Sequence, residues 1–440
     1  MHGKSKKKPW SVFIAIFMAF LLGSITKSNT EILGLNLVAT YDVIGKLFIN
    51  ALTLVVVPLV SASIITGIAR IGNEQDFGRL SAKTFIFFIS TTMIAICIGL
   101  FFINLIGPGY SHSAISAEFV GEVNIAEIQQ KLSSTGGGNF VELLMKIVPS
   151  NIVAAFSAGN MLGLIFFSLL FGYAISKIDK RVAAPLQLFW EGVFQAMIQI
   201  THMVMNVLPI GVFCLVSKTV ITAGVESFGS LAKFFFTVML GFAVFSLIAL
   251  PLLLKFVARV SPIRAFQALG PALITAFSTS SSSATLPITI ECVEKRAGVS
   301  NRICSLVIPL GTSINMSGSA LYECAAAMFV AQVYGIHIPL LTQFFLVFIA
   351  LLTSMGVAGI PSGSLVALVV ILKSMGLPIE GIGLFFAIDR LIDMSRTAVN
   401  VLSDSCCAIL VAKSEGENNV LTVAPDELEE MLTNLPSQET

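Results

Sequence analysis

Long apolar runs alternate with short polar stretches along most of the chain. One run begins at Trp10, directly after a lysine-rich start, and others without charged residues cover 47–69, 84–106, 152–176, 192–217 and 234–254. Each has about 20 residues or more, enough for a helix to cross roughly 30 Å of hydrocarbon. The pattern predicts transmembrane helices at these positions. The basic start resembles a signal peptide, but no convincing cleavage site follows, so the first run is predicted to be the first transmembrane helix.

The next apolar stretch, 265–290, is interrupted at its centre by hydroxyl residues. Six consecutive serines and threonines run from Ser278 to Ser283, and Pro287 follows shortly after. Such backbone at membrane depth must be surrounded by protein or water. The sequence therefore favours two half-helices that meet at a serine tip, a re-entrant hairpin. The alternative is one straight helix with a polar centre, since membrane helices tolerate serine and threonine.

A second interrupted stretch covers 324–372, which contains no Asp, Glu, Lys or Arg. It is too long for one crossing, and Gly356, Gly359, Pro361 and Gly363 lie near its middle. Glycine and proline there again predict a broken hairpin. Each hairpin precedes a helix with a polar centre, at a matching spacing of 34 residues (282 to 316 and 359 to 393). Matching broken segments in two halves indicate a secondary transporter with an inverted repeat.

Composition supports a membrane protein and excludes other classes. Apolar residues make up 55% of the 440 residues, charged residues only 12%, and the mean hydropathy is +0.91. A soluble enzyme, a disordered chain or a secreted disulfide scaffold would not combine these values. The net charge of +1 gives no indication of a nucleic-acid partner. The cysteines show no metal-ligand spacing and are interpreted as free thiols: Cys97, Cys214, Cys292, Cys304, Cys324, Cys406 and Cys407.

Basic residues predict the orientation of the spans. They concentrate in alternate loops, at Arg70, Arg79 and Lys83, at Lys177, Lys180 and Arg181, and at Lys255, Arg259 and Arg264. The positive-inside rule then places the N-terminus in the cytoplasm. The segment 107–146 is expected to be external, and the polar tail after residue 413 is expected to be cytoplasmic.

The last apolar helix carries charged residues on one face. At 100° per residue, five polar side chains fall within an arc of about 80°: Asp389, Asp393, Arg396, Asn400 and Asp404. Four of them are charged, and burying all four at the bilayer centre would cost up to roughly 10–14 kcal/mol. The face is therefore expected to line a protein cavity that holds ions or ligand. The alternative is an ion-pair network that neutralises itself, although acids outnumber bases there.

The preceding helix, 309–323, indicates a cation site. Gly311 and Gly318 bracket Asn315 and Met316, a pattern typical of local unwinding that exposes backbone carbonyls to hard cations such as Na⁺. Glu323 follows as a lone acid in apolar surroundings and is a candidate proton carrier. The alternative for Glu323 is a position at a helix end near water.

These residues resemble the dicarboxylate/amino acid:cation symporter family, the glutamate and aspartate transporters, over nearly the whole chain. The resemblance rests on the serine tip, Asn315-Met316-x-Gly318, Gly359-Ile360-Pro361 and a pattern from Asp393 to Asp404. It implies an all-α polytopic membrane protein with eight transmembrane helices, two re-entrant hairpins, an elevator fold with inverted repeats, and a homotrimer. The implied divisions are scaffold helices 1–2 (1–82), transport-unit helix 3 (83–108), an external loop with scaffold helices 4–5 (109–229), a transport core (230–413) and a cytoplasmic tail (414–440).

The resemblance also implies roles for single residues. Arg396 would bind the substrate's side-chain carboxylate and Asp393 its α-amino group. The remaining substrate-site residues would be Asn400, Thr397, Ser319, Ser281, Ser282, Ser283, Ile360 and Gly363. One implied sodium site combines Asp404, Asn400, Asn315 and Gly311, and a second combines Ser313, Ser354, Met355 and Val357.

Two departures from the family pattern affect the expected ion coupling and charge balance. Ser317 stands where many relatives have Asp, and Phe88 stands where a Tyr of the same ion site occurs, beside Thr91 and Thr92. A third sodium site is therefore in doubt, and fewer sodium ions or proton coupling become the expectation. Relatives tend to keep an arginine either at the serine tip or beside the substrate arginine, and here Ser280 and Ser395 occupy these two positions.

The sequence thus predicts a symporter of glutamate or aspartate in the bacterial inner membrane. It would be driven by Na⁺ or H⁺, with no catalytic residues, no cofactor and no nucleic-acid partner. A C4-dicarboxylate or neutral amino acid symporter of the same fold is the alternative within the family. An ion channel built from broken hairpins is the alternative from another class.

Overall fold

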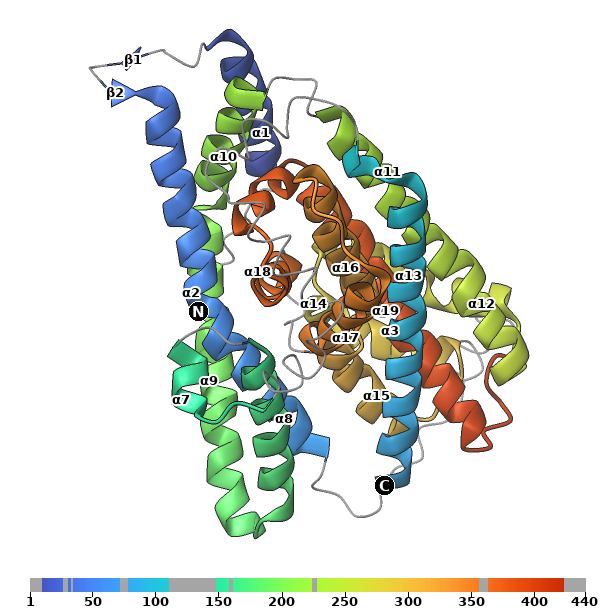
Figure 1. Cartoon of the computed structure of the whole chain (residues 1–440). Helices are drawn as coiled ribbons and strands as arrows, with labels where there is room; N and C mark the ends of the chain where they lie inside the picture. The colour runs from blue at the N-terminus through green and yellow to red at the C-terminus, as the bar shows by residue number, and fades with distance from the viewer. Residues whose placement is uncertain are drawn as a thin grey trace, which may run out of the picture.

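The computed structural model describes residues 10–26, 31–32, 35–71, 78–110, 148–157, 161–223, 228–355 and 363–422. Nearly all of these residues are helical, so the predicted all-α class is confirmed (Figure 1). The exception is a two-stranded antiparallel ribbon of β1 (Glu31–Ile32) and β2 (Leu35–Asn36). The expected external segment lies mostly outside the described residues, as does the tail beyond residue 422.

One group of helices lies on the side of the molecule drawn in blue and green in Figure 1. Its members are α1 (Trp10–Ile25), α2 (Leu37–Ile71), α7 (Ile152–Ser157), α8 (Met161–Lys177), α9 (Lys180–Asn206) and α10 (Leu208–Ala223). Helix α2 packs against α8, α9 and α10, and α1 packs against α10. These contacts join helices from distant parts of the sequence into one layer.

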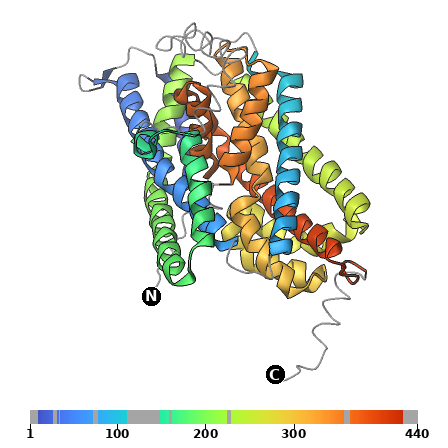
Figure 2. The same ribbon diagram turned by 60° about the horizontal axis from the view of Figure 1, so that its bottom comes forward.

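The second group gathers around the C-terminal helix α19 (Asp389–Ser414) (Figures 1 and 2). Its members are α3 (Gly78–Ile106), η2 (Pro108–Tyr110), α11 (Phe228–Val244), η5 (Phe245–Ala249), α12 (Leu250–Leu253), η6 (Leu254–Ala258), α13 (Pro262–Thr279), α14 (Ser282–Glu291), η7 (Cys292–Arg296), α15 (Asn301–Ile314), α16 (Ser317–Val333), α17 (Leu340–Ser354), α18 (Gly363–Met375) and η8 (Ile379–Ala387). Helices α3, α13, α15 and α16 all pack on α19. The charged helix is therefore enclosed by protein.

Three stretches of the described chain are long and apolar enough to cross a membrane as helices: Arg79–Tyr110, Gly229–Ala258 and Asn301–Val333. A fourth would be the pair α9 and α10, which meet at an angle of 54°. The expected straight span 192–217 is therefore bent. Pro209 supplies the physical reason, because it has no N–H to continue the hydrogen bonds of α9. The predicted count of eight spans stays a prediction.

The interrupted stretch 265–290 forms two helices, as predicted, and the single straight helix is wrong. Helix α13 ends at Thr279 and α14 begins at Ser282. Ser280 adopts a left-handed conformation with φ of 52°, and the Ser281 hydroxyl accepts a hydrogen bond from the Ala284 N–H at 3.2 Å. The serines thus reverse the chain and cap the second helix. The break between α17 and α18 falls at 356–362, outside the described residues.

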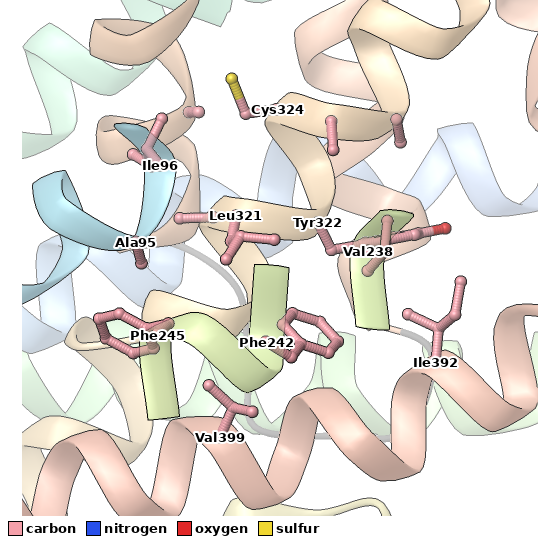
Figure 3. Close-up of a cluster of buried hydrophobic side chains, with 14 of the residues drawn as sticks. Ala95, Ile96, Val238, Phe242, Phe245, Leu321, Tyr322, Cys324, Ile392 and Val399 are labelled. Atoms are coloured by element: carbon pink, nitrogen blue, oxygen red, sulfur yellow. The ribbon is translucent and has the colours of Figure 1, made fainter. Parts of the chain in front are cut away.

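A buried apolar cluster fixes α16 against α3, α11 and α19 (Figure 3). Leu321 and Tyr322 of α16 lie at its centre, with neighbours from the other three helices and from η5: Ala95, Ile96, Val238, Phe242, Phe245, Ile392 and Val399. A Cβ added at Gly99 would lie 3.0 Å from Leu321 Cγ, so α3 and α16 approach closely there. This packing holds the polar faces of α16 and α19 at a fixed separation.

The segment that follows α19 binds the ends of other helices in the second group. Lys83 of α3 donates to the Ser414 carbonyl at 2.9 Å and to the Glu415 carboxylate, and this bond lowers the pKa of Glu415. Arg264 of α13 donates to the Thr422 carbonyl at 2.7 Å. The Leu421 N–H donates to the Ala297 carbonyl at 2.9 Å. The end of α19 is therefore anchored to α3 and α13.

Candidate functional site

The site is built where the helical stretch 301–333 breaks. Asn315 (φ −99°, ψ 63°) and Met316 (φ −91°, ψ 59°) are not helical and separate α15 from α16. The predicted unwinding is therefore confirmed. Asn315 therefore lies between the two helices and not on α16. The break interrupts the hydrogen-bond ladder, which frees backbone groups for a ligand.

Two glycines let α19 approach this break closely. A Cβ at Gly311 would lie 2.6 Å from Asp404 Cγ, and a Cβ at Gly318 would lie 2.9 Å from the Arg396 carbonyl oxygen. Real side chains do not tolerate such distances, so both positions need glycine. The two glycines therefore bring the polar face of α19 into contact with the unwound segment.

Asn400 of α19 caps the start of α16. Its Oδ1 accepts hydrogen bonds from the backbone N–H groups of Gly318 (2.8 Å) and Ser319 (3.3 Å). Its Nδ2 donates to the Ser319 hydroxyl at 3.1 Å. A side chain from another helix thus satisfies donors that a helix start leaves open. The structure brings these two predicted substrate-site residues together.

A neutral polar cluster surrounds the Asn315 amide; we call Asn315, Thr91, Thr92, Ser317 and Ser403 the amide–hydroxyl cluster. Asn315 Oδ1 accepts from the hydroxyls of Thr91, Thr92 and Ser317 at 3.1–3.2 Å. Asn315 Nδ2 donates to the Ser403 hydroxyl at 3.1 Å. Ser317 also contacts Thr92 and Ser403, each at 3.1 Å. Phe88 is buried on the same helix as the two threonines. The cluster satisfies its own hydrogen bonds.

Asp404 lies next to this cluster and differs from it in charge. Its Oδ1 accepts from Asn315 Nδ2 at 2.9 Å, while Oδ2 is buried and has no hydrogen-bond partner in the described part of the chain. The salt bridges of the described residues do not include Asp404. A buried carboxylate without a basic partner requires another cation or a proton. Asp404 and the nearby Gly311 and Asn315 are therefore suited to hold a hard cation.

A charged cluster lies about two to four turns before Asp404 on α19; we call Arg390, Asp393 and Arg396, together with Tyr322 of α16, the arginine–aspartate cluster. Arg396 Nη2 pairs with Asp393 Oδ1, and Arg390 Nη1 lies 3.8 Å from Asp393 Oδ2. The Arg396 guanidinium also stands over the Tyr322 ring, 5.4 Å from its centroid. Arg396 Nη1 is buried and makes no hydrogen bond within the described residues. A fixed, incompletely paired guanidinium suits capture of a carboxylate.

Glu323 of α16 is completely buried, which rules out the alternative of a helix end near water. The polar groups that face it are the Ser364 hydroxyl of α18 and the Arg396 guanidinium. Neither Glu323 oxygen makes a hydrogen bond of good geometry among the described residues. A carboxyl group in this setting is suited to carry a proton.

The remaining predicted residues are less closely connected. The Thr397 hydroxyl donates to the Asp393 carbonyl at 2.8 Å, within its own helix. Ser282 is buried and Ser283 exposed, and the tip helices α13 and α14 pack on α19. Gly363 is buried at the start of α18, whereas Ile360 lies outside the described residues.

The second predicted sodium site is only partly described. Ser313 lies on α15, and Ser354 is buried at the end of α17 with its hydroxyl donating to Leu351. Met355 follows it, and Val357 lies outside the described residues. Among the hydrogen bonds of the described residues, none joins Ser313 to Ser354, so this site stays a prediction.

The sequence reasoning missed Arg390, Tyr322 and Ser403. On a helical wheel Arg390 lies 100° from Asp389, just outside the polar arc. Ser403 lies about 20° outside the other edge of the arc, and a single serine between Leu402 and Asp404 is easily taken for packing. Tyr322 belongs to an apolar stretch, and only its position under Arg396 gives it a role.

Comparisons with known proteins agree with this geometry. The model of the sodium:dicarboxylate symporter family matches residues 9–414. A proton/sodium-glutamate symport protein of Geobacillus stearothermophilus is 36% identical over 93% of this chain and 95% of its own length. A proton/glutamate-aspartate symporter of Escherichia coli is 35% identical over 92% of each chain. The mouse excitatory amino acid transporter 3 is 32% identical over 92% of this chain and 84% of its own.

Proposed function

The chain belongs to the sodium:dicarboxylate symporter family, and from this premise we propose that it carries glutamate or aspartate into the cell with Na⁺, H⁺ or both. The observation that carries the proposal is the arginine–aspartate cluster. A buried guanidinium and a buried carboxylate lie one helical turn apart on the same face of α19. An acidic amino acid offers the complementary pair, a side-chain carboxylate and an α-ammonium group.

Binding would proceed by exchange of partners. In the described structure Arg396 and Asp393 satisfy each other. The substrate carboxylate would take the Arg396 fork, and the substrate ammonium would take its place at Asp393. Asn400, Thr397, Ser319 and the backbone of the two hairpin tips would complete the pocket. Arg396 and Asp393 would therefore select a substrate that has a side-chain carboxylate and an ammonium group in addition to its α-carboxylate.

Coupling to cations is supported by Asp404. The unpartnered Oδ2 of this buried carboxylate would bind Na⁺ together with oxygens of Gly311, Asn315 and Asn400. A second Na⁺ would bind Ser313 and the backbone of 354–357. The amide–hydroxyl cluster has no carboxylate and satisfies its own hydrogen bonds, so we do not assign it a third Na⁺.

A proton would be carried by Glu323. Its complete burial means that a negative charge there would be costly. Glu323→Gln keeps the size of the side chain and removes the proton site. In proteoliposomes with an inward proton gradient, this variant is expected to lose the stimulation of uptake by acid pH outside. Equal stimulation in variant and wild type would exclude Glu323 as the proton carrier.

We propose an elevator movement for transport. The helices around α19 would form the transport unit, with α3, and those around α2 the scaffold, in a homotrimer of the bacterial inner membrane with cytoplasmic termini. The separation of the helices into two groups supports this division (Figure 1). The broken α17–α18 pair would be the extracellular gate.

Two alternatives within the fold have specific signatures. A C4-dicarboxylate has no ammonium group for Asp393, and a neutral amino acid has no side-chain carboxylate for Arg396. Each would leave one buried charge of the cluster without a new partner, which is unfavourable.

An ion channel is the alternative from another class, and it would show a large flux that does not saturate with substrate concentration.

The test is uptake of labelled L-aspartate into proteoliposomes that contain the purified chain. We expect saturable uptake with an inward Na⁺ gradient, an inward H⁺ gradient or both, and competition by L-glutamate. Uptake of succinate or serine without uptake of aspartate would contradict the substrate assignment. Protein-free liposomes and liposomes without an ion gradient are the controls.

A further inference from the structure

Arg390 contacts the proposed ammonium-binding aspartate from the side opposite to Arg396. Its Nη1 lies 3.8 Å from Asp393 Oδ2, whereas Arg396 pairs with Oδ1. The two guanidiniums therefore divide the two carboxylate oxygens between them. We propose that Arg390 is a positioning residue that holds Asp393 in place for the substrate's α-amino group; this inference rests on the proposed function.

The burial of Arg390 supports a role in the site. Only 19% of its side chain is exposed, and its Nε is buried without a hydrogen-bond partner among the described residues. An arginine that only reached for water would extend its head group into solvent. Here the guanidinium instead remains beside an aspartate whose side chain is 1% exposed.

The exchange of partners at Arg396 explains why a second cation is needed. When Arg396 turns both of its nitrogens to a substrate carboxylate, its hold on Asp393 Oδ1 weakens. A buried carboxylate left alone would be unfavourable or would take up a proton. Arg390 at Oδ2 keeps a positive charge beside Asp393 during the exchange. Oδ1 then remains in position to accept a hydrogen bond from the substrate's ammonium group.

Neighbouring positions that could supply this charge are neutral. Ser280 at the hairpin tip has a buried hydroxyl without a partner in the described residues, and the Ser395 hydroxyl donates to the Leu391 carbonyl at 3.2 Å. Asp393 forms salt bridges with Arg390 and Arg396. Arg390 is thus the cation that stays with Asp393 when Arg396 is engaged.

The experiment is a double-mutant cycle. It compares the wild type, Arg390→Gln, Asp393→Asn and the double variant. We expect Arg390→Gln to raise the KM for L-aspartate about tenfold, which corresponds to ~1.4 kcal/mol, and to change kcat less than about twofold. In the Asp393→Asn background, Arg390→Gln should change the KM for L-aspartate less than about twofold, because Arg390 acts on the substrate through Asp393. Arg390→Lys should restore most of the affinity.

A second readout separates positioning from general damage. Succinate has no amino group, so its inhibition constant against L-aspartate uptake should be the same in Arg390→Gln and the wild type. Substrate-dependent thermal stabilisation of the purified variants checks that they fold and measures binding without transport. Lys373→Gln, which removes a charge from the last turn of α18, is the matched control.

The outcomes distinguish this inference from the proposed function. An unchanged or lowered KM in Arg390→Gln, or an equal effect in the Asp393→Asn background, overturns the role of Arg390 and leaves the proposed function standing. A wild-type protein that neither binds nor transports any acidic amino acid overturns both.

Discussion

Two buried polar clusters contact the polar face of α19 and differ in chemistry. The arginine–aspartate cluster is charged, and Arg396 Nη1 and Arg390 Nε make no hydrogen bonds among the described residues. The amide–hydroxyl cluster is neutral, and its four hydroxyls and one amide bond to one another. Burial is nearly complete in both, except at Arg390, whose side chain is 19% exposed. The arginine–aspartate cluster therefore has donors available for a ligand, whereas the groups of the amide–hydroxyl cluster already bond to one another.

This difference indicates where ligands bind. Unpaired groups in a buried charged cluster are unfavourable until a ligand completes them. A neutral cluster that completes itself gains little from an added ion. Asp404 is intermediate in its hydrogen bonding. Its Oδ1 accepts a hydrogen bond from Asn315, whereas its Oδ2 has no partner among the described residues. We expect substrate at the first cluster, a cation at Asp404, and neither at the four hydroxyls of the second cluster.

The largest effect is expected for Arg396→Ala. It removes two charge-assisted hydrogen bonds to the substrate carboxylate, each contributing about 1.5–3 kcal/mol, so affinity for L-aspartate should fall at least 100-fold. The concentration dependence of uptake measures this. Arg181→Ala, at the exposed start of α9, is the control. An Arg396→Ala variant with wild-type affinity would exclude the arginine–aspartate cluster as the substrate site.

Asp404→Asn should have the next largest effect. It keeps the shape of the side chain but removes the charge that would hold Na⁺. The apparent affinity for Na⁺ should fall about 10- to 100-fold, as for loss of one charged contact. Titration of aspartate uptake with NaCl at constant ionic strength measures it. An unchanged Na⁺ dependence in a sodium-driven wild type would place the cation elsewhere.

Ser317→Asp tests the neutral cluster by adding a carboxylate to it. Without Na⁺ the buried charge should lower stability by about 1–3 kcal/mol, and Na⁺ should restore part of this loss. Thermal unfolding with NaCl or choline chloride measures both effects. Ser317→Ala is the control, because it changes the same residue without adding a charge. The stability of this variant should not depend on Na⁺. Equal Na⁺ responses of the two variants would show that the cluster cannot accept a cation.

Thr92→Val should have the smallest effect. The change keeps the shape of the side chain and removes the hydrogen bonds to Asn315 and Ser317, so stability should fall by about 1 kcal/mol. The Na⁺ dependence and the KM for aspartate should stay within about twofold of wild type. A large shift in Na⁺ affinity would mean that the hydroxyls of this cluster do bind a cation.

Much of this arrangement could be predicted from the sequence because polar residues are rare within membrane-spanning segments and are easily recognised there. Apolar runs predicted the helices, six hydroxyl residues predicted the break at Ser280–Ser281, and two glycines predicted the unwinding at Asn315–Met316. The polar face of α19 followed from helical periodicity alone. In each case a polar or flexible residue at membrane depth has few possible structures.

What the sequence did not determine depends on contacts between distant segments. The closure of the amide–hydroxyl cluster and the contact of Arg390 with Asp393 required the packed structure. Thr91 and Ser403 are 312 positions apart, yet both bond to one amide. Local periodicity fixes which face of a helix is polar, but only packing determines which groups meet there and whether they satisfy one another. The sequence therefore determined the class, the breaks and the charged face, and the tertiary structure determined which polar groups remain open for a ligand.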